Sequence, residues 1–147
     1  MFFRRQRDAK WAAAAKETAW RRADEFCWEF HVAATVFELA GRRAELLDAA
    51  REAEGQFRQA QAQHAPDAEV RRLAEDLDVA LTEVMRAAYA AQRAEIGPRG
   101  YDDRIYRRKA KATPRVHALT AEAEHLLTLR ETHRLTGIPA VPYDPAR

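Results

Sequence analysis

Residues 26–41 read FCWEFHVAATVFELAG, and this stretch decides the fold. Its apolar side chains recur three or four residues apart on two sides, so a helix here would be apolar around most of its circumference. Such a helix belongs inside a bundle or at a subunit interface. It is too short and too often interrupted by charge to cross a bilayer, which takes about 20 apolar residues. We therefore expect the other helices to pack around it.

The composition predicts an all-α protein. Hydrophobic residues make up 47% and charged residues 33% of the 147 residues, a mixture typical of long helices when Ala, Glu and Arg dominate it. The five glycines and six prolines are too few for the many turns of a sheet protein. We predict a three- to four-helix bundle built on a long antiparallel helical hairpin. Residues 1–136 would form a single helical domain and residues 137–147 an extended, proline-containing tail.

Helical periodicity and helix breakers predict helices over residues 8–53, 67–96 and 113–135. A strand is the competing reading for residues 30–39, where β-branched and aromatic residues favour sheets, but the alternation fails at Ala33 and Ala34. Gly41 is a point where the first helix kinks or ends. The polar run after Gly55 has little to bury, so we expect it to be a solvated helical extension or a frayed connector. Pro66 ends that run. We expect residues 97–112 to connect the last two helices.

The helix over residues 67–96 has the clearest apolar repeat in the chain. One heptad position holds Val70, Leu77, Val84 and Ala91. A second position, three residues on, continues this stripe, which is typical of a helix that packs along a partner in coiled-coil fashion. The charged residues fall on the opposite face, which we expect to be exposed: Arg71, Arg72, Glu75, Asp76, Glu83 and Arg86. The second helix should therefore pack antiparallel on the first.

Charge and cysteine content indicate the compartment. Two basic segments, over residues 1–22 and 99–117, bracket an acidic and apolar middle, although the net charge is only +2. The single cysteine, Cys27, forms no intramolecular disulfide and requires no oxidising compartment. The basic start of the chain is not followed by the apolar segment of a signal peptide. We expect a cytoplasmic protein without a membrane partner.

Protein–protein contact is the leading functional hypothesis. A helix that is apolar on two sides has more aromatic surface than three or four helices of one chain readily cover, and exposed surface of that kind marks a partner site. We expect a non-enzymatic accessory or assembly protein that self-associates or docks to a protein partner through residues 20–40. The expected interface residues are Trp20, Phe26, Trp28, Phe30, Val32, Phe37 and Leu39.

Nucleic-acid binding through the basic segment 99–115 is the alternative hypothesis. Its seven cations match phosphates, and its two tyrosines could stack on bases. A solvated connector that keeps the protein soluble would have the same composition. The candidate residues are Arg99, Tyr101, Arg104, Tyr106, Arg107, Arg108, Lys109, Lys111 and Arg115.

Enzyme activity is the third and weakest hypothesis. The run Glu122–His125 holds one Glu-x-x-His, half of the ligand set of a carboxylate-bridged metal site in a helical bundle, and no second copy exists. His117, His125 and His133 drift around their helix, so we expect them on its surface. No phosphate-binding loop, nucleophile elbow or zinc motif appears in the sequence. We expect no catalytic residue, metal, cofactor or small-molecule substrate.

Overall fold

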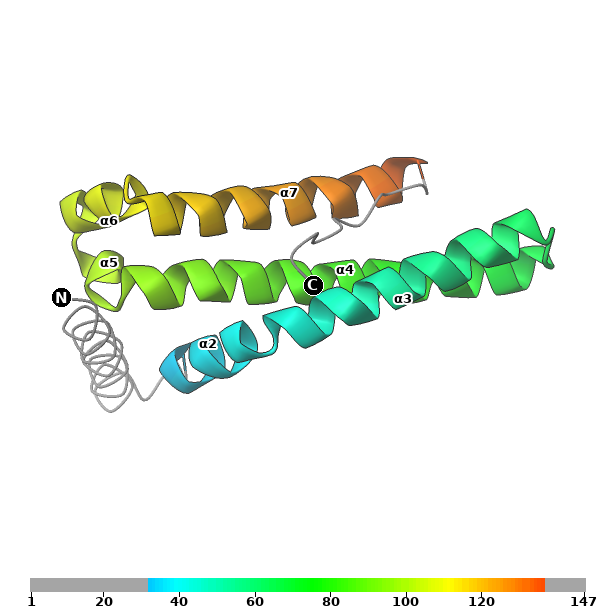
Figure 1. The fold of residues 1–147 in the computed structure, drawn as a ribbon, viewed down its shortest axis with the longest axis horizontal. Coiled ribbons are helices and arrows are strands. Elements are labelled where there is room, and N and C mark those ends of the chain that lie inside the picture. Colours follow the sequence, from blue (N-terminus) through cyan, green and yellow to red (C-terminus); the bar gives the residue numbers. More distant parts are fainter. Residues whose placement is uncertain (1–31, 137–147) are drawn as a thin grey trace, which may run out of the picture.

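The computed structural model describes residues 32–136, and every element in that part of the chain is a helix (Figure 1). This confirms the all-α class. The helices, in chain order, are α2 (Val32–Gly41), α3 (Arg43–Ala62), α4 (Asp67–Ile96), α5 (Arg99–Asp102), α6 (Arg104–Lys111) and α7 (Pro114–Thr136).

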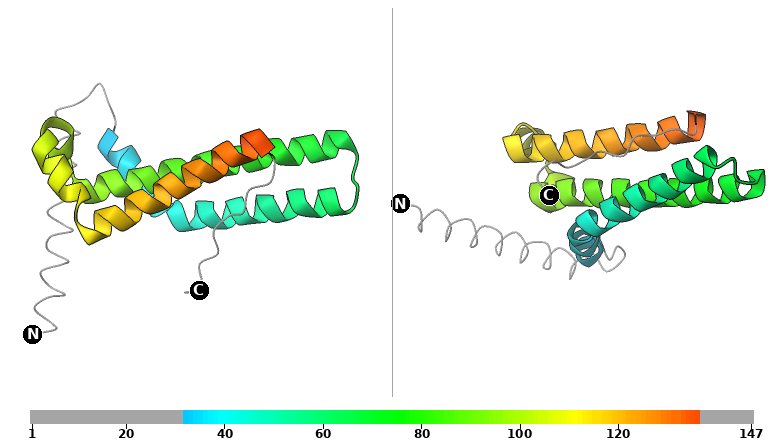
Figure 2. Two further views of the ribbon diagram at one scale, coloured as in Figure 1. Left: turned by 90° about the horizontal axis from the view of Figure 1, so that it is seen from above. Right: turned by 45° about the vertical axis from the view of Figure 1, so that its right-hand side comes forward.

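The central element of the described bundle is α4, not the helix that contains residues 32–41. Helices α3 and α7 lie along α4 on different sides, and α2 packs against its C-terminal half (Figures 1 and 2). Leu77, Leu81, Val84 and Ala87 of α4 are completely buried. The apolar stripe of α4 is wide enough to contact helices on more than one side. The expectation that the bundle wraps around residues 26–41 is therefore wrong for the described part of that stretch.

The hairpin consists of α3 and α4, joined by residues 63–66. Its turn follows the Schellman pattern: the amide of His64 donates to Gln61 O, the amide of Ala65 donates to Ala60 O, and His64 is left-handed with φ 52°. Helix α3 continues to Ala62, beyond the predicted end near residue 53, so the run after Gly55 is a helical extension and not a frayed connector. Burial of Phe57 and Ala60 against α4 stabilises this extension.

A break at Arg42 divides the described part of the first predicted helix into α2 and α3. The amide of Arg42 donates to both Glu38 O and Leu39 O, each at 3.2 Å, so an i→i−3 hydrogen bond occurs beside the usual i→i−4 bond. The regular i→i−4 pattern is present again at Leu46, whose amide donates to Arg42 O at 2.9 Å. The break is thus a kink beside Gly41. Residues 8–31 of that predicted helix, and the tail 137–147, lie outside the described residues.

Three helices share one apolar core. Leu46, Ala50 and Phe57 come from α3, and the buried face of α4 lies opposite them. Helix α7 closes the core with Ala123, Leu126 and Leu129. The bounds of α4 and α7 agree, to within one residue, with the helices predicted over residues 67–96 and 113–135. The six charged residues expected on the outer face of α4 are all exposed.

Residues 97–112 connect α4 to α7 through two short helices, α5 and α6. Gly97, with φ 90°, ends α4 and turns the chain back. Gly100 then lies so close to Ile96 that a Cβ atom there would collide with the isoleucine side chain. The carboxylate of Asp103 accepts a 2.8 Å hydrogen bond from the amide of Tyr106, which caps the start of α6. These local contacts substitute for the apolar residues that the segment lacks.

Candidate functional site

The basic segment 99–115 lies at one end of the bundle, where α5, α6 and the start of α7 follow the end of α4 (Figure 1). Within α6, four cations are spaced at i, i+3, i+4 and i+7, a spacing that places them along one side of a helix. All four side chains are exposed. We call this set the α6 cationic stripe: Arg104, Arg107, Arg108 and Lys111.

Acidic neighbours neutralise only the two ends of the segment. Arg99 pairs with Asp103 at 3.2 Å, and Arg115 pairs with Glu95 of α4, also at 3.2 Å. Within residues 32–136, no ion pair involves the stripe or the adjacent Lys109. Five positive charges of one eight-residue helix are therefore left without an acidic partner in the described part of the protein.

The helix dipole explains only some of these charges. Cations in the last turn of a helix are stabilised by the partial negative charge there, by about 0.3–1 kcal/mol each, which suits Arg108, Lys109 and Lys111. Arg104 is the first residue of α6, where the dipole disfavours a cation. Like charges four residues apart, as in Arg104–Arg108, repel by about 0.2–0.5 kcal/mol. The position of Arg104 and its repulsion with Arg108 are thus locally unfavourable, and an anion bound beside them would offset that cost.

Asp103 holds α6 in place through its charge. The hydrogen bond from the Tyr106 amide lowers the pKa of Asp103, and Arg99 lowers this pKa further. The side chain is therefore an ionised cap at neutral pH. The same arginine stacks on the ring of Tyr106, with its Cζ atom 4.9 Å from the ring centroid. Arg99, Asp103 and Tyr106 consequently form the base that positions the stripe.

The two tyrosines of the segment have different surroundings. Tyr106 is half-buried beneath Arg99, so one face of its ring is already covered. Tyr101 is 50% exposed and lies beside Arg107 at the edge of a pocket. Ile105, 69% exposed, lies between Arg104, Arg108 and Lys109 in a shallow hollow on the outer side of α6. The outward surface of α6 is thus cationic with one apolar side chain.

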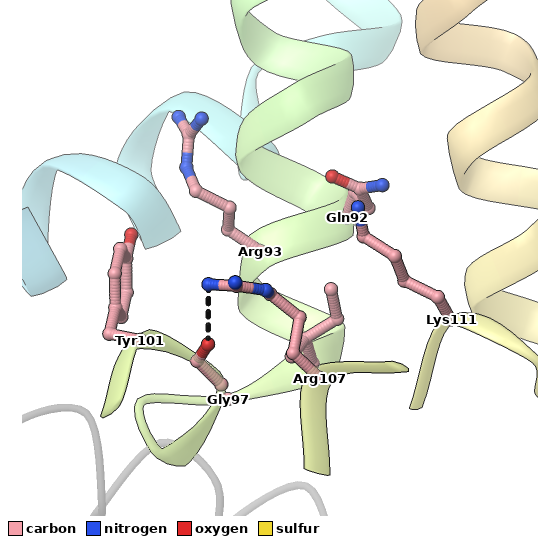
Figure 3. Close-up of a pocket in the computed structure, with 8 residues that line it drawn as sticks. Gln92, Arg93, Gly97, Tyr101, Arg107 and Lys111 are labelled. Atoms are coloured by element: carbon pink, nitrogen blue, oxygen red, sulfur yellow. Dashed lines mark hydrogen bonds between the residues drawn. The ribbon is translucent and has the colours of Figure 1, made fainter. Parts of the chain in front are cut away.

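A small pocket opens where α4, α5 and α6 meet (Figure 3). Three of its residues, Tyr101, Arg107 and Lys111, are among the candidates predicted from the sequence, whereas Gln92 and Arg93 are not. Those two lie in the last turns of α4, and nothing local in the sequence connects them with α6. The pocket is lined by Gln92, Arg93, Ile96, Gly97, Gly100, Tyr101, Arg107 and Lys111.

The predicted aromatic interface is described only in part. Trp20, Phe26, Trp28 and Phe30 lie outside the described residues, and Val32 is the first residue of α2. The two described side chains are half-buried and face the bundle. Phe37 lines a groove beside the alanines of α4, and Leu39 packs against the core cluster. Among the described residues, this part of α2 therefore contributes to packing within the bundle.

The histidines of α7 differ from one another. His117 and His125 are exposed as expected, but His133 is buried at 6% exposure, so its predicted surface position is wrong. The ring of His133 packs on the ring of Phe57 and is therefore shielded from solvent.

Glu122 of the Glu-x-x-His run is paired with Arg43 of α3 at 3.2 Å. No group of three or more metal-binding side chains occurs in residues 32–136.

No helix within the described range is long and apolar enough to span a membrane. Comparisons with protein-family models, curated proteins and solved structures found no match for this chain. The candidate function therefore rests on the charge and geometry of the site itself.

Proposed function

We propose that this protein is a non-enzymatic accessory protein that binds the phosphate backbone of nucleic acid through the α6 cationic stripe. The observation that supports this most strongly is the lack of acidic partners for the stripe and Lys109 within residues 32–136. Guanidinium groups bind phosphate oxygens through two parallel hydrogen bonds, and three of the four stripe residues are arginines. The single cysteine, which needs no oxidising compartment, is consistent with action in the cytoplasm.

The arrangement favours backbone contact over reading of a base sequence. Helix α6 has eight residues, fewer than the recognition helices that reach base edges along a major groove, and its outward side chains are mostly cations. Phosphate contacts of this kind position a protein on a strand without specifying sequence. The expected ligand is therefore single- or double-stranded nucleic acid of any sequence.

The test is the binding of the full chain to labelled single- and double-stranded oligonucleotides at 50 mM salt. The triple variant Arg104→Gln/Arg108→Gln/Lys109→Gln should lose most of the binding. A matched control, Arg71→Gln/Arg72→Gln/Arg86→Gln, removes the same charge from the exposed face of α4 and should bind almost as the wild type does. Wild-type protein that binds no DNA or RNA at this salt concentration would contradict the proposal, and so would equal losses in both variants.

We also propose assembly through α2 as a second function, on a separate observation. Helix α2 has one charged residue, Glu38, and it packs mainly against α4 at the margin of the described bundle. A helix that is apolar on nearly every side belongs at an interface when it is not central. Light scattering at tens of micromolar should then give a dimer, a larger oligomer or a complex with a co-purifying protein. A lone monomer would contradict this second proposal.

A further inference from the structure

The pocket between α4, α5 and α6 has the size of a single small group. Its volume is about 170 Å³. Sites for drug-sized ligands occupy about 300–1,000 Å³. This pocket is smaller than such sites, and its size suits a single phosphate group.

Three cations reach this pocket and none of its lining residues is acidic. Arg93 comes from α4, and Arg107 and Lys111 come from α6 (Figure 3). The Nη1 atom of Arg107 donates to Gly100 O at 3.1 Å, which fixes the guanidinium within the pocket and leaves its other N–H groups available. No ion pair within the described residues neutralises any of the three.

The walls of the pocket are fixed by buried contacts. Gln92 is only 7% exposed, and its Nε2 atom donates to Thr120 Oγ1 of α7 at 2.6 Å. The hydroxyl of Thr120 in turn donates to Val116 O at 2.8 Å. These two hydrogen bonds restrict rotation of the side-chain amide of Gln92. Gly97 and Gly100 form the floor, and the latter has no room for a Cβ atom. The buried residues of the lining are therefore held in place by packing.

We infer that this pocket binds the terminal phosphate of a nucleic-acid strand that lies along the α6 cationic stripe. Arg107 and Lys111 belong to both features, so the pocket continues directly from the stripe. A terminal phosphomonoester carries about −1.5 to −2 charge at pH 7, whereas an internal phosphodiester carries −1. Three cations with no lining acid match the more highly charged group. The inference deepens the proposed function and rests on it for the identity of the strand.

A purely structural role is the competing explanation for these cations. Positive side chains at the C-terminal end of a helix stabilise its unpaired carbonyls, and Arg93 lies in the last turn of α4. Of the three, only Arg107 donates a hydrogen bond to a carbonyl oxygen within the described residues. A structural role predicts that removing the charge lowers stability and leaves any preference between strand ends unchanged.

The experiment compares one single-stranded oligonucleotide with a 5′-phosphate, a 3′-phosphate or hydroxyls at both ends. Each binds the full chain at the same salt concentration. Charge-assisted hydrogen bonds to the terminal phosphate should make either the 5′- or the 3′-phosphorylated strand bind about tenfold more tightly than the strand with hydroxyls at both ends. Arg107→Gln and Lys111→Gln should each reduce this ratio toward one. The control Arg108→Gln removes a charge from the same helix outside the pocket, so it should weaken all three strands alike and keep the ratio.

A second measurement separates failure of the pocket from failure of the proposed function. Inorganic phosphate added to the full chain should shift the amide NMR signals of Gly97 and Gly100 in the wild type and in Arg108→Gln, but not in Arg107→Gln. Equal binding of all three strands would overturn the terminal-phosphate inference and leave backbone binding intact. Phosphate-dependent shifts without binding of any strand would support the pocket and overturn the proposed function. Neither shifts nor a strand preference would overturn the inference outright.

Discussion

The ring of His133 in α7 meets the ring of Phe57 in α3 edge to face, with centroids 5.7 Å apart and ring planes at 83°. The Nε2 atom of His133 also lies 2.8 Å from Ala74 O of α4. Because a carbonyl oxygen can only accept, Nε2 carries the proton in this contact. One buried histidine therefore connects all three long helices near the hairpin end of the bundle.

Phe57 should be among the most costly residues to truncate. It is buried in the core, and Phe→Ala substitutions at such positions cost about 3–5 kcal/mol because they leave a cavity. Phe57→Ala should lower the free energy of unfolding by that amount in a denaturant titration. The control is Gln56→Ala at the adjacent exposed position, where a loss of less than about 0.5 kcal/mol is expected. Similar small losses in both variants would mean that α3 does not pack on the core beyond Gly55.

The fold was predictable where one apolar period dominates. Helix α4 has the predicted bounds because its heptad is continuous between Pro66 and Gly97. The end of α3 was missed because Phe57 and Ala60 are isolated in a polar run, and their burial depends on α4. Helix α6 was missed because its stabilising contacts are polar. The signal that could have found it is Asp103, an N-cap residue directly before the helix.

The candidate site was predictable only as a list of charges. Proximity in sequence could have revealed the Arg99–Asp103 pair, because residues four apart meet on a helix. The Arg115–Glu95 pair joins different helices and depends on the tertiary fold. The same holds for Gln92 and Arg93, which reach the pocket only because α4 ends beside α6. The spacing of residues along the sequence therefore predicts where the cations lie on a helix. It does not predict which of them form ion pairs with acidic residues of other helices.

The pair of Asp78 and Arg134 should make stability depend on pH. Arg134 donates to both carboxylate oxygens, at 2.7 and 3.1 Å, and these bonds lower the pKa of Asp78, although partial burial acts in the opposite direction. A folded pKa below the unfolded value of about 3.9 gives stability that is present above that pH. This contribution is lost as the pH falls through the folded pKa.

The measurement is the free energy of unfolding at several pH values between 6 and 2. Wild type should exceed Asp78→Asn in stability at pH 6, and the difference should shrink toward zero in acid. Asp76→Asn is the matched control, since Asp76 pairs with Arg72 inside one exposed helical turn. A difference between wild type and Asp78→Asn that stays constant with pH would show that the ion pair does not act through the ionised carboxylate.

Asp103 should control the order of α6 independently of the bundle. Asp103→Ala removes the N-cap, and hydrogen exchange at the Tyr106 amide should accelerate while the core of α4 and α7 remains protected. Asp103→Asn keeps a capping oxygen without the charge, so it should retain only part of this protection at neutral pH. Because the folded pKa of Asp103 is lowered, the wild-type protection should decrease to the level of Asp103→Asn as the pH falls through that pKa. Equal exchange in wild type and Asp103→Ala would mean that the cap does not stabilise α6.

The salt dependence of binding tests the α6 cationic stripe most directly. Each phosphate contact contributes about 0.7–0.9 to the slope of log K against log salt concentration, the lower value applying to single strands. Arg104→Gln/Arg108→Gln/Lys109→Gln should therefore flatten the slope for a single-stranded oligonucleotide by about two units relative to the wild type. Arg71→Gln/Arg72→Gln/Arg86→Gln should leave the slope unchanged. A wild-type slope near zero, or the same flattening in both triple variants, would contradict backbone binding by the stripe.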